Sequence, residues 1–310
     1  MERRPFIIDT DCGVDDAVAI MMALAAEDVE VVGVTAVAGN VSIDHVLDNL
    51  HRLLAYFGHE QLPIYEGAHR SLLGEQERAS AIHGENGLGN VELPKRDKGA
   101  PGSCESPEMN AASGLRKLLY QYPGATVVAL GPLTNLAIAF ALYPELVDKI
   151  GRLVVMGGAL DEGNVTRFAE FNFYADPEAV QCVLSTGISL ELLPWDACLL
   201  HRFSPEDIDA FEVPPGKAGD LFRKLQEHIY GVTTRMFGAP SVMHADPFAI
   251  ACAIDSGVVS RKIQTGLRME LGNNGMRGMS VRVEGYGVTC NLDLHMDRYG
   301  EILRQIGNLR

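Results

Sequence analysis

The sequence is poor in positive charge. Its 310 residues include 26 Lys and Arg against 41 Asp and Glu, which gives a formal net charge of −15. No basic stripe interrupts this acidity, and because nucleic acids are bound mainly by Lys and Arg, the composition argues against a nucleic-acid partner. The acidic residues are spread along the chain, as expected of a soluble, self-repelling surface.

Long apolar runs and paired cysteines are also missing. No run approaches the roughly 18 apolar residues of a membrane span, and residues 1–5 lead into acidic sequence too soon for a signal peptide. The six cysteines are scattered, with no CxxC pair and no zinc-type spacing. Buried thiols in a reducing environment are their simplest interpretation. We therefore expect a cytoplasmic protein that has no membrane partner.

The length and the order of apolar segments predict the fold class. A chain with 47% apolar residues and 32 glycines is long enough for one large α/β domain or at most two domains. The expected strands are residues 6–9, 30–38, 63–65, 125–130, 152–156 and 188–193. The expected helices are residues 15–26, 42–57, 107–120, 133–142 and 177–184. Their alternation predicts a single domain over residues 1–310, with a mainly parallel, Rossmann-like sheet flanked by helices and the active site at the C-terminal ends of the strands.

The remaining segments are less regular. Residues 67–106 are rich in Gly, Pro and charge and predict one long loop, which in a compact domain is usually functional. A second loop is expected over residues 157–176. Residues 205–260 are expected to be helical, residues 263–296 to form short strands or a hairpin, and residues 297–306 to close the chain as a helix.

The most informative segment is an acidic turn near the start of the chain. Asp9 and Asp11 follow an apolar run, the chain turns at Gly13, and Asp15 and Asp16 begin a helix. Carboxylates this close repel one another, so some could take up protons. A hard cation with oxygen ligands resolves the repulsion better. The apolar run before them predicts a buried site.

Other polar clusters follow the expected strands. They are Gly39-Asn40, residues 131–135 and Gly157-Gly158. Because the C-terminal ends of parallel strands meet at one edge of a sheet, we expect these clusters to converge there.

The motifs carrying these clusters occur in the order of a known family. They are residues 9–17 (DTDCGVDDA), 38–40 (AGN), 83–89 (HGENGLG), 131–135 (GPLTN), 156–159 (MGGA), 169–173 (AEFNF), 176–179 (DPEA) and 245–247 (ADP). On these motifs the chain resembles the inosine-uridine-preferring nucleoside hydrolases. The resemblance implies hydrolysis of the N-glycosidic bond of ribonucleosides to ribose and free base, with one Ca²⁺ and assembly as a homodimer or homotetramer.

The resemblance also implies a role for individual residues. The Ca²⁺ ligands would be Asp11, Asp16, the backbone carbonyl of Thr134, and Asp246, a set of oxygen donors that suits Ca²⁺. Asp11 would also be the general base that takes a proton from the attacking water. The ribose-binding positions would be Asp15, Asn164, Glu170 and Asn172, with Met156 and Asn40 lining the pocket.

One position departs from the family pattern. Many members have a histidine directly before the metal-binding Asp-Pro, where it can protonate the leaving base, but this chain has Ala245 there. His244 comes one residue earlier, and in an extended segment it would face the opposite side. Either His244 still reaches the base, or another group such as His83 or Tyr230 supplies the proton, or the preferred base leaves without strong acid help.

Structural roles compete with some of these assignments. Asp9 could simply satisfy neighbouring backbone groups, and Asn40 could be a turn residue. Asp15 and Asp16 would be favoured in a first helical turn by the helix dipole alone. His83 could be a surface histidine in a glycine-rich loop. Trp195 follows a strand and could lie near the pocket, although a structural role against the core is favoured. Tyr230 and Phe237 could equally pack in the core or stack on a base.

Two other classes of protein share part of this pattern. An Asp-x-Asp after the first strand also opens Mg²⁺-dependent phosphatases of the haloacid-dehalogenase kind, in which the first Asp is the nucleophile. Those enzymes have no role for Glu170 and Asn172. A catalytically weak nucleoside- or ribose-binding protein is the second alternative, and Ala245 is its only support.

Overall fold

The structure is a computed structural model that describes residues 3–74, 78–94 and 109–310. In these residues one sheet contains eight strands in the order β3-β2-β1-β4-β5-β6-β8-β7. The strands are β1 (Arg4–Thr10), β2 (Val29–Ala36), β3 (Ile64–Glu66), β4 (Thr126–Ala129), β5 (Arg152–Met156), β6 (Leu190–Leu193), β7 (Val259–Met269) and β8 (Ser280–Leu294). Every neighbouring pair is parallel except β7 and β8. The predicted mainly parallel sheet and the predicted hairpin near the end of the chain are confirmed.

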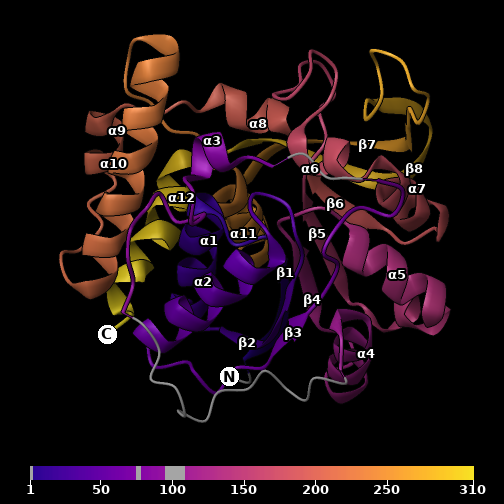
Figure 1. Ribbon diagram of the computed structural model, residues 1–310, viewed down its shortest axis with the longest axis horizontal. Coiled ribbons are helices and arrows are strands. Elements are labelled where there is room, and N and C mark those ends of the chain that lie inside the picture. Colours follow the sequence, from indigo (N-terminus) through magenta and orange to yellow (C-terminus); the bar gives the residue numbers. More distant parts are fainter. Residues whose placement is uncertain (1–2, 75–77, 95–108) are drawn as a thin grey trace.

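Helices cover both faces of the sheet (Figure 1). On one side lie α1 (Val14–Ala25), α2 (Ile43–Tyr56), α10 (Lys217–Phe237), α11 (Ala245–Ile254) and α12 (Met296–Arg304). On the other side lie α4 (Ala111–Gln121), α5 (Thr134–Leu142) and α7 (Pro177–Ser185). The buried apolar residues form two clusters that correspond to these two layers.

Strand β1 and helix α1 are buried because they lie at the centre of this arrangement. From Phe6 to Thr10 every residue of β1 is buried, as expected for a parallel strand with helices on both faces. Helix α1 is buried nearly all round, since it packs against the sheet, α10 and α11. The acidic turn between β1 and α1 therefore lies in the interior.

Two short helices correct the expected loops, and two breaks correct the expected helical region. The prediction of one uninterrupted loop over residues 67–106 is wrong at α3 (Ser80–His83), and residues 75–77 and 95–106 lie outside the described part. The loop expected over residues 157–176 contains α6 (Phe171–Ala175). The helical region expected over residues 205–260 is interrupted after α9 (Pro205–Ala210) and again between α10 and α11. Short helices were missed because four to six residues carry too little periodicity to be recognised.

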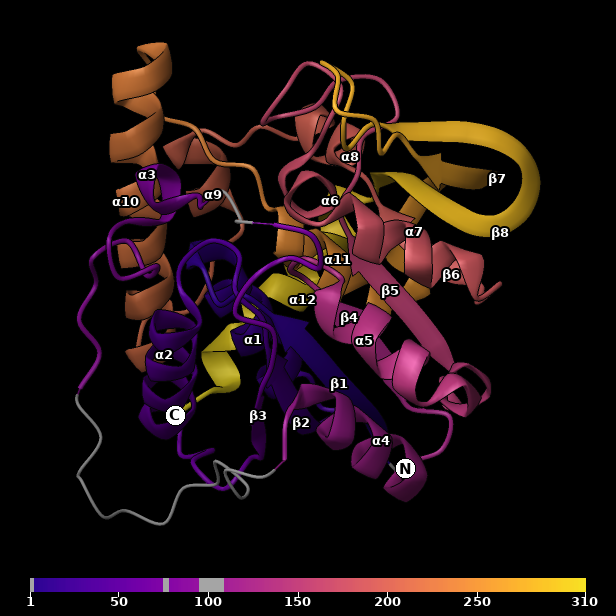
Figure 2. The ribbon, with the colours of Figure 1, turned by 45° about the vertical axis from the view of Figure 1, so that its right-hand side comes forward.

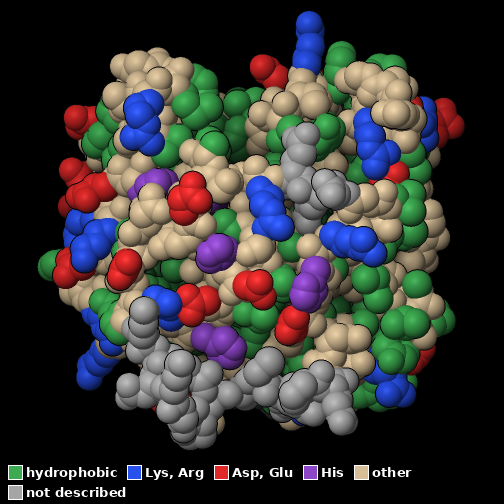
Figure 3. Space-filling view, viewed as in Figure 1, with side chains coloured by type: hydrophobic (Ala, Val, Ile, Leu, Met, Phe, Trp, Pro, Cys, Tyr) green, Lys and Arg blue, Asp and Glu red, His purple; other side chains and the backbone are tan. Residues whose placement is uncertain are grey.

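The β7–β8 hairpin extends to one side of the molecule, beyond the helical layers (Figure 2). Acidic and basic side chains are interspersed on the face drawn in Figure 3, so that face has no wide patch of one sign. Among the described residues, no helix is both long enough and apolar enough to cross a membrane.

Candidate active site

The candidate site lies where the strand order reverses. Strand β1 has β2 on one side and β4 on the other, so the chain segments leaving β1 and β4 diverge at this edge. A crevice at such a switch point is the usual ligand site of an open parallel sheet. The acidic turn leaves β1 here, and Thr134 begins α5 after β4.

Carboxylates from two distant segments meet at this edge. Oxygens of Asp15, Asp16 and Asp246 all lie within 4.8 Å of one another. Asp246 comes from the first turn of α11, which packs against α1. This cluster differs from the expected ligand set because it includes Asp15 and not Asp11.

Asp11 is joined to the cluster through Asn40. The backbone N–H of Asn40 donates to Asp11 Oδ2 at 2.7 Å, and its side-chain amide donates to Asp11 at 3.1 Å and to Asp16 at 3.2 Å. Gly39 allows this approach, since a Cβ there would lie 2.0 Å from Asp11 Oδ2. Asn40 therefore holds two carboxylates in place.

Asp16 is also fixed by its own turn. Its carboxylate accepts hydrogen bonds from the Thr10 hydroxyl and from the backbone N–H of Gly13, the second at 2.7 Å. Gly13 is the N-cap of α1 and Asp16 its third residue, so this side chain closes the first turn of the helix. One carboxylate thus caps α1 and faces the acidic cluster.

Burial gives these carboxyl groups unusual acid–base properties. The pKa of Asp15 is raised to about 6 by burial, and the pKa values of Asp11 and Asp16 are raised by burial together with nearby carboxylates. Asp246 has a raised pKa for the same two reasons. A cation would remove both penalties, because it supplies the opposite charge that buried carboxylates otherwise lack.

The donor set of the site fits a hard divalent cation. The clustered groups are carboxylates, and no His or Cys belongs to the group among the described residues. Asp15 Oδ1 and Asp9 Oδ2 are enclosed and have no hydrogen-bond partner in that part of the chain. Orphaned anionic oxygens beside oxygen donors suit Ca²⁺ or Mg²⁺ and do not suit Zn²⁺.

Asp9 lies behind the cluster. Its Oδ1 accepts hydrogen bonds from the Thr35 hydroxyl and from the Asn135 amide, the second at 2.7 Å. Burial raises its pKa to about 6. Asn135 also donates to the Ala36 carbonyl and accepts from the Ala68 N–H, so it connects three segments at the edge of the sheet.

Thr134 is buried beside this network. Its hydroxyl donates to Asp176 at 2.7 Å, and Asp176 also caps α7 by accepting from the Ala179 N–H. The side chain of Thr134 is therefore occupied, and its backbone carbonyl stays a predicted cation ligand.

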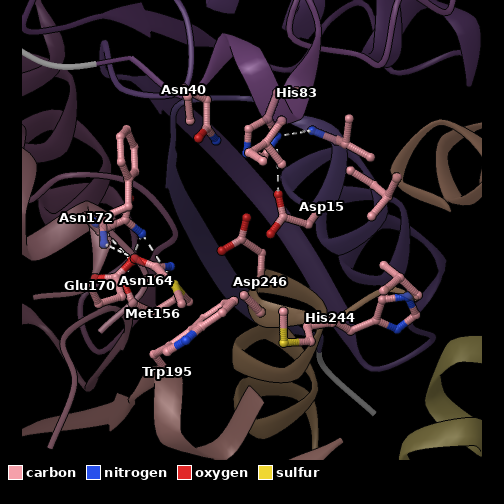
Figure 4. A pocket seen from close by; sticks show the side chains of 18 of the residues that line it. Asp15, Asn40, His83, Met156, Asn164, Glu170, Asn172, Trp195, His244 and Asp246 are labelled. Carbon is pink, nitrogen blue, oxygen red and sulfur yellow. Dashed lines mark hydrogen bonds and ion pairs between the residues drawn. The ribbon is translucent and has the colours of Figure 1, made fainter. Parts of the chain in front are cut away.

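Glu170 and Asn172, two of the residues expected to bind ribose, lie across the cavity from Asp15 (Figure 4). Glu170 caps α6 and accepts hydrogen bonds from the N–H groups of Gly158, Asn172 and Phe173. Burial raises its pKa to about 7. The Asn172 amide nitrogen donates to the carbonyls of Leu130 and Met156, which leaves its oxygen as an acceptor.

A cavity of about 280 Å³ joins these groups. Figure 4 shows Glu170, Asn164, Asn172, Met156 and Trp195 on one side of Asp246, with Asn40, His83 and Asp15 along the opposite wall. Twelve side chains that the sequence analysis singled out line the cavity: Asp15, Asn40, His83, Met156, Asn164, Glu170, Asn172, Trp195, Phe237, His244, Ala245 and Asp246. Tyr230 is not among the lining residues, and its hydroxyl donates to the Ser204 carbonyl at 3.4 Å.

His83 is held in a neutral form beside Asp15. Its Nδ1 accepts a hydrogen bond from the Val14 N–H at 3.1 Å and lies 3.7 Å from Asp15 Oδ1. Burial lowers its pKa to about 4, despite the nearby Asp16. Its proton is therefore on Nε2, and the ring is a hydrogen-bond donor at neutral pH.

His244 is buried and has partners on both ring nitrogens. Nδ1 lies 2.6 Å from the Tyr299 hydroxyl and Nε2 lies 2.9 Å from Gln226 Oε1. Burial lowers its pKa to about 3. In Figure 4 its ring points away from Asp246.

Sequence reasoning missed most of the cavity wall on α10. The missed lining residues there are Gln226, Ile229, Thr233 and Met236. The sequence predicted that this segment is helical, but only the packing of α10 against α1 and α3 decides which of its residues face the cavity.

The fold and this cavity define a class of protein. It is an α/β enzyme with buried carboxylates and amides gathered at the C-terminal ends of parallel strands. The family model for "Inosine-uridine preferring nucleoside hydrolase" matches residues 6–302. The chain therefore belongs to the inosine-uridine preferring nucleoside hydrolases, and it is a ribonucleoside hydrolase.

Its relatives carry several substrate descriptions. The chain is 33% identical to the pyrimidine-specific ribonucleoside hydrolase RihA of Klebsiella pneumoniae, over 97% of each chain. It is 34% identical to uridine nucleosidase 1 of Arabidopsis thaliana, over 82% of this chain and 74% of that one. Among solved structures, an inosine-guanosine nucleoside hydrolase superposes with a TM-score of 0.89 at 27% identity, and 99% of each chain is covered.

Proposed function

We propose that the protein hydrolyses ribonucleosides with one Ca²⁺ and with Asp11 as the base that activates water. The observation that carries this proposal is the meeting of Asp15, Asp16 and Asp246 within 4.8 Å at the sheet edge. Asp16 and Asp246 are buried and Asp15 is partly buried, and carboxylates at that separation need a counter-charge. The residues that would hold the cation are Asp11, Asp16, Asp246 and the Thr134 carbonyl. When bound, such a cation makes a coordinated water more acidic.

Asp11 takes the proton of the attacking water in this proposal. Its carboxylate is fully buried, and Asn40 holds both of its oxygens through the backbone N–H and the side-chain amide. A fixed base needs no reorganisation before it accepts a proton. Without Asp11, the attacking water would have to give its proton to another water, which is a much weaker base than a carboxylate.

Both walls of the cavity position the sugar. Asp15 and the Asn172 oxygen offer acceptors, and the Asn164 amide nitrogen offers a donor because its oxygen accepts from the Phe171 N–H. Ribose hydroxyls are both donors and acceptors, so this mixed set can hold the ring in one orientation. As positive charge develops at C1′, nearby carboxylates stabilise the oxocarbenium-like transition state.

Free-base release tests the proposal directly. Uridine, cytidine, inosine, adenosine and guanosine would be assayed with added Ca²⁺ and again with a chelator. We expect base release that the chelator abolishes and Ca²⁺ restores. Release that is unaffected by complete metal removal would contradict the role of the cation.

A pair of variants isolates the role of Asp11. Asp11→Asn should lower kcat by at least about 10³-fold while the fold is retained, since removing a general base typically costs about 10² to 10⁴. Asp209→Asn, an exposed residue on α9, is the matched control and should behave as wild type. Near-normal turnover in Asp11→Asn would reject Asp11 as the base.

The binding-protein alternative gives a different result in the same assay. A binding protein would retain one intact nucleoside per chain and release no base over time. We also expect a homodimer or homotetramer in the cytoplasm, which the mass in solution and cell fractionation would test.

A further inference from the structure

The cavity continues past the ribose groups toward a polar end. Beyond Asp246 its walls are formed by α1, α10 and the start of α11, including Val18, Ile229 and Ala245. Gln226 and His244 also line this part, and both are almost completely buried. Figure 4 shows His244 on the side of Asp246 away from Glu170 and Asn172. Gln226, which contacts His244, therefore lies at the end remote from the sugar.

The buried Tyr299 hydroxyl determines which nitrogen of His244 carries the proton. His244 Nδ1, at 2.6 Å, is the only hydrogen-bond partner of this hydroxyl among the described residues. If His244 were protonated on Nδ1, the Tyr299 hydroxyl hydrogen would have no acceptor in a fully buried position. An unsatisfied buried donor costs about 1–3 kcal/mol. Tyr299 therefore donates to Nδ1, and the neutral ring carries its proton on Nε2.

The proton on Nε2 determines the orientation of the Gln226 amide. His244 Nε2–H donates to Gln226 across 2.9 Å, so the atom that accepts must be the amide oxygen. The Gln226 amide nitrogen then has no hydrogen-bond partner among the described residues. It is nevertheless not fully enclosed by protein. Since Gln226 lines the cavity, this NH₂ group opens onto it.

We propose that Gln226 is a specificity-determining residue, whose amide NH₂ donates to a carbonyl oxygen on the edge of the leaving base remote from the glycosidic bond. Tyr299 and His244 are positioning residues that act through it. This proposal rests on the proposed ribonucleoside hydrolysis. It adds the class of base: those with an oxo group at the remote edge, such as uracil and hypoxanthine.

Bases with an amino group at that edge fit this end poorly. Cytosine and adenine would present N–H donors to the Gln226 donor, and the surrounding wall of Val18 and Ile229 offers no acceptor. His83 Nε2–H is a further donor facing the same cavity. A site that leaves polar groups unpaired with the wrong substrate discriminates against it. We expect kcat/KM to be about 10- to 100-fold higher for uridine than for cytidine, and higher for inosine than for adenosine.

The test is the ratio of kcat/KM for uridine to that for cytidine in a set of variants. Gln226→Met removes the donor at similar length and should bring the ratio close to one. Gln226→Glu places an acceptor at the same point and should turn the preference toward cytidine. Glu227→Gln, an exposed neighbour on α10, is the control and should keep the wild-type ratio.

Tyr299→Phe tests whether Tyr299 positions Gln226 through His244. It also keeps the proposal testable if a variant at Gln226 does not fold. Loss of the hydroxyl frees His244 to carry its proton on Nδ1 and frees the amide to turn over, so the ratio should fall. A general packing defect would lower kcat/KM for both nucleosides by the same factor. An unchanged ratio in folded, active Gln226→Met or Tyr299→Phe would overturn this proposal. Failure of the wild-type protein to release any base would instead overturn the proposed function.

Discussion

The backbone N–H of Val14 donates a hydrogen bond to Nδ1 of His83 across 3.1 Å. This single contact decides what His83 can do, because Nδ1 is then an acceptor and the ring proton is on Nε2. Burial lowers the pKa of His83 to about 4, so the ring is neutral above that pH. We therefore expect His83 to donate a hydrogen bond to the leaving base and not to transfer a proton from an imidazolium.

We expect His83→Gln to lower kcat/KM for uridine by about 10-fold, the value of one lost hydrogen bond of about 1.4 kcal/mol. The pH profiles of the variant and of the wild type should be parallel from about pH 5 to 9, since the wild-type ring does not titrate there. Both profiles can be measured by base release. A wild-type activity that declines above about pH 6.5, with the decline absent from the variant, would show that His83 acts as a cationic acid.

Cation binding should change how stability depends on pH. The Asp15 pKa is raised from 3.8 to about 6, so without a cation this group favours the folded state in its protonated form. That stabilisation is complete below the unfolded pKa and is lost as the pH rises through about 6. The chelated protein should therefore melt at a lower temperature at pH 7 than at pH 5. Ca²⁺ at about 100 times its Kd should restore about 2.7 kcal/mol at pH 7.

Asp15→Asn provides the comparison for this prediction. It removes one buried negative charge, so the chelated variant should lose less stability between pH 5 and pH 7 than the chelated wild type. Thermal unfolding followed by circular dichroism gives both values. Identical pH dependence in the two proteins would show that Asp15 is not the group responsible.

The sheet and the acidic turn could be predicted because they depend on local sequence. Residues 152–156 are a short apolar run with β-branched residues between Gly151 and Gly157, which is typical of a buried strand, and the predicted bounds are confirmed by β5. The family was equally accessible, since its motifs lie in short continuous stretches, and the match over residues 6–302 confirms it.

The end of the cavity next to His244 could not be predicted in the same way. Sequence order alone showed that His244 is one residue from the family's histidine position, but not that Tyr299 and Gln226 occupy its two nitrogens. Those contacts join residues 55 and 18 positions away in the chain, and they depend on how α10, α11 and α12 pack together. Tertiary packing of this kind leaves no local pattern to read.

Asn135 should prove important for stability and for cation affinity. Its amide joins Asp9, the Ala36 carbonyl and the Ala68 N–H, and it directly follows Thr134. Asn135→Ala would leave three buried or half-buried polar groups without this partner, at a cost of about 1–3 kcal/mol for each one that stays unsatisfied. We expect a loss of at least about 2 kcal/mol in urea unfolding and weaker Ca²⁺ binding by calorimetry. Asn273→Ala, at an exposed position, is the control, and an equal effect there would refute the prediction.

The groups proposed to bind the sugar, Asp15 and Asn172 among them, should discriminate strongly against 2′-deoxyribonucleosides. Asp15 Oδ1 has no hydrogen-bond partner among the described residues, and the Asn172 amide nitrogen is occupied by two carbonyls, so the acceptors left in the cavity need hydroxyl donors. A deoxyribose leaves such an acceptor unpaired in a buried site and also removes one oxygen that could approach the cation. Sites built to bond a hydroxyl reject analogues lacking it by about 10⁴-fold. We expect kcat/KM for 2′-deoxyuridine to be at least about 10³-fold below that for uridine, with most of the loss in kcat, because the same contacts orient the ring for attack. Equal rates would mean that the 2′-hydroxyl does not contact these groups, and the assignment of Asp15 and Asn172 to the ribose would then be wrong.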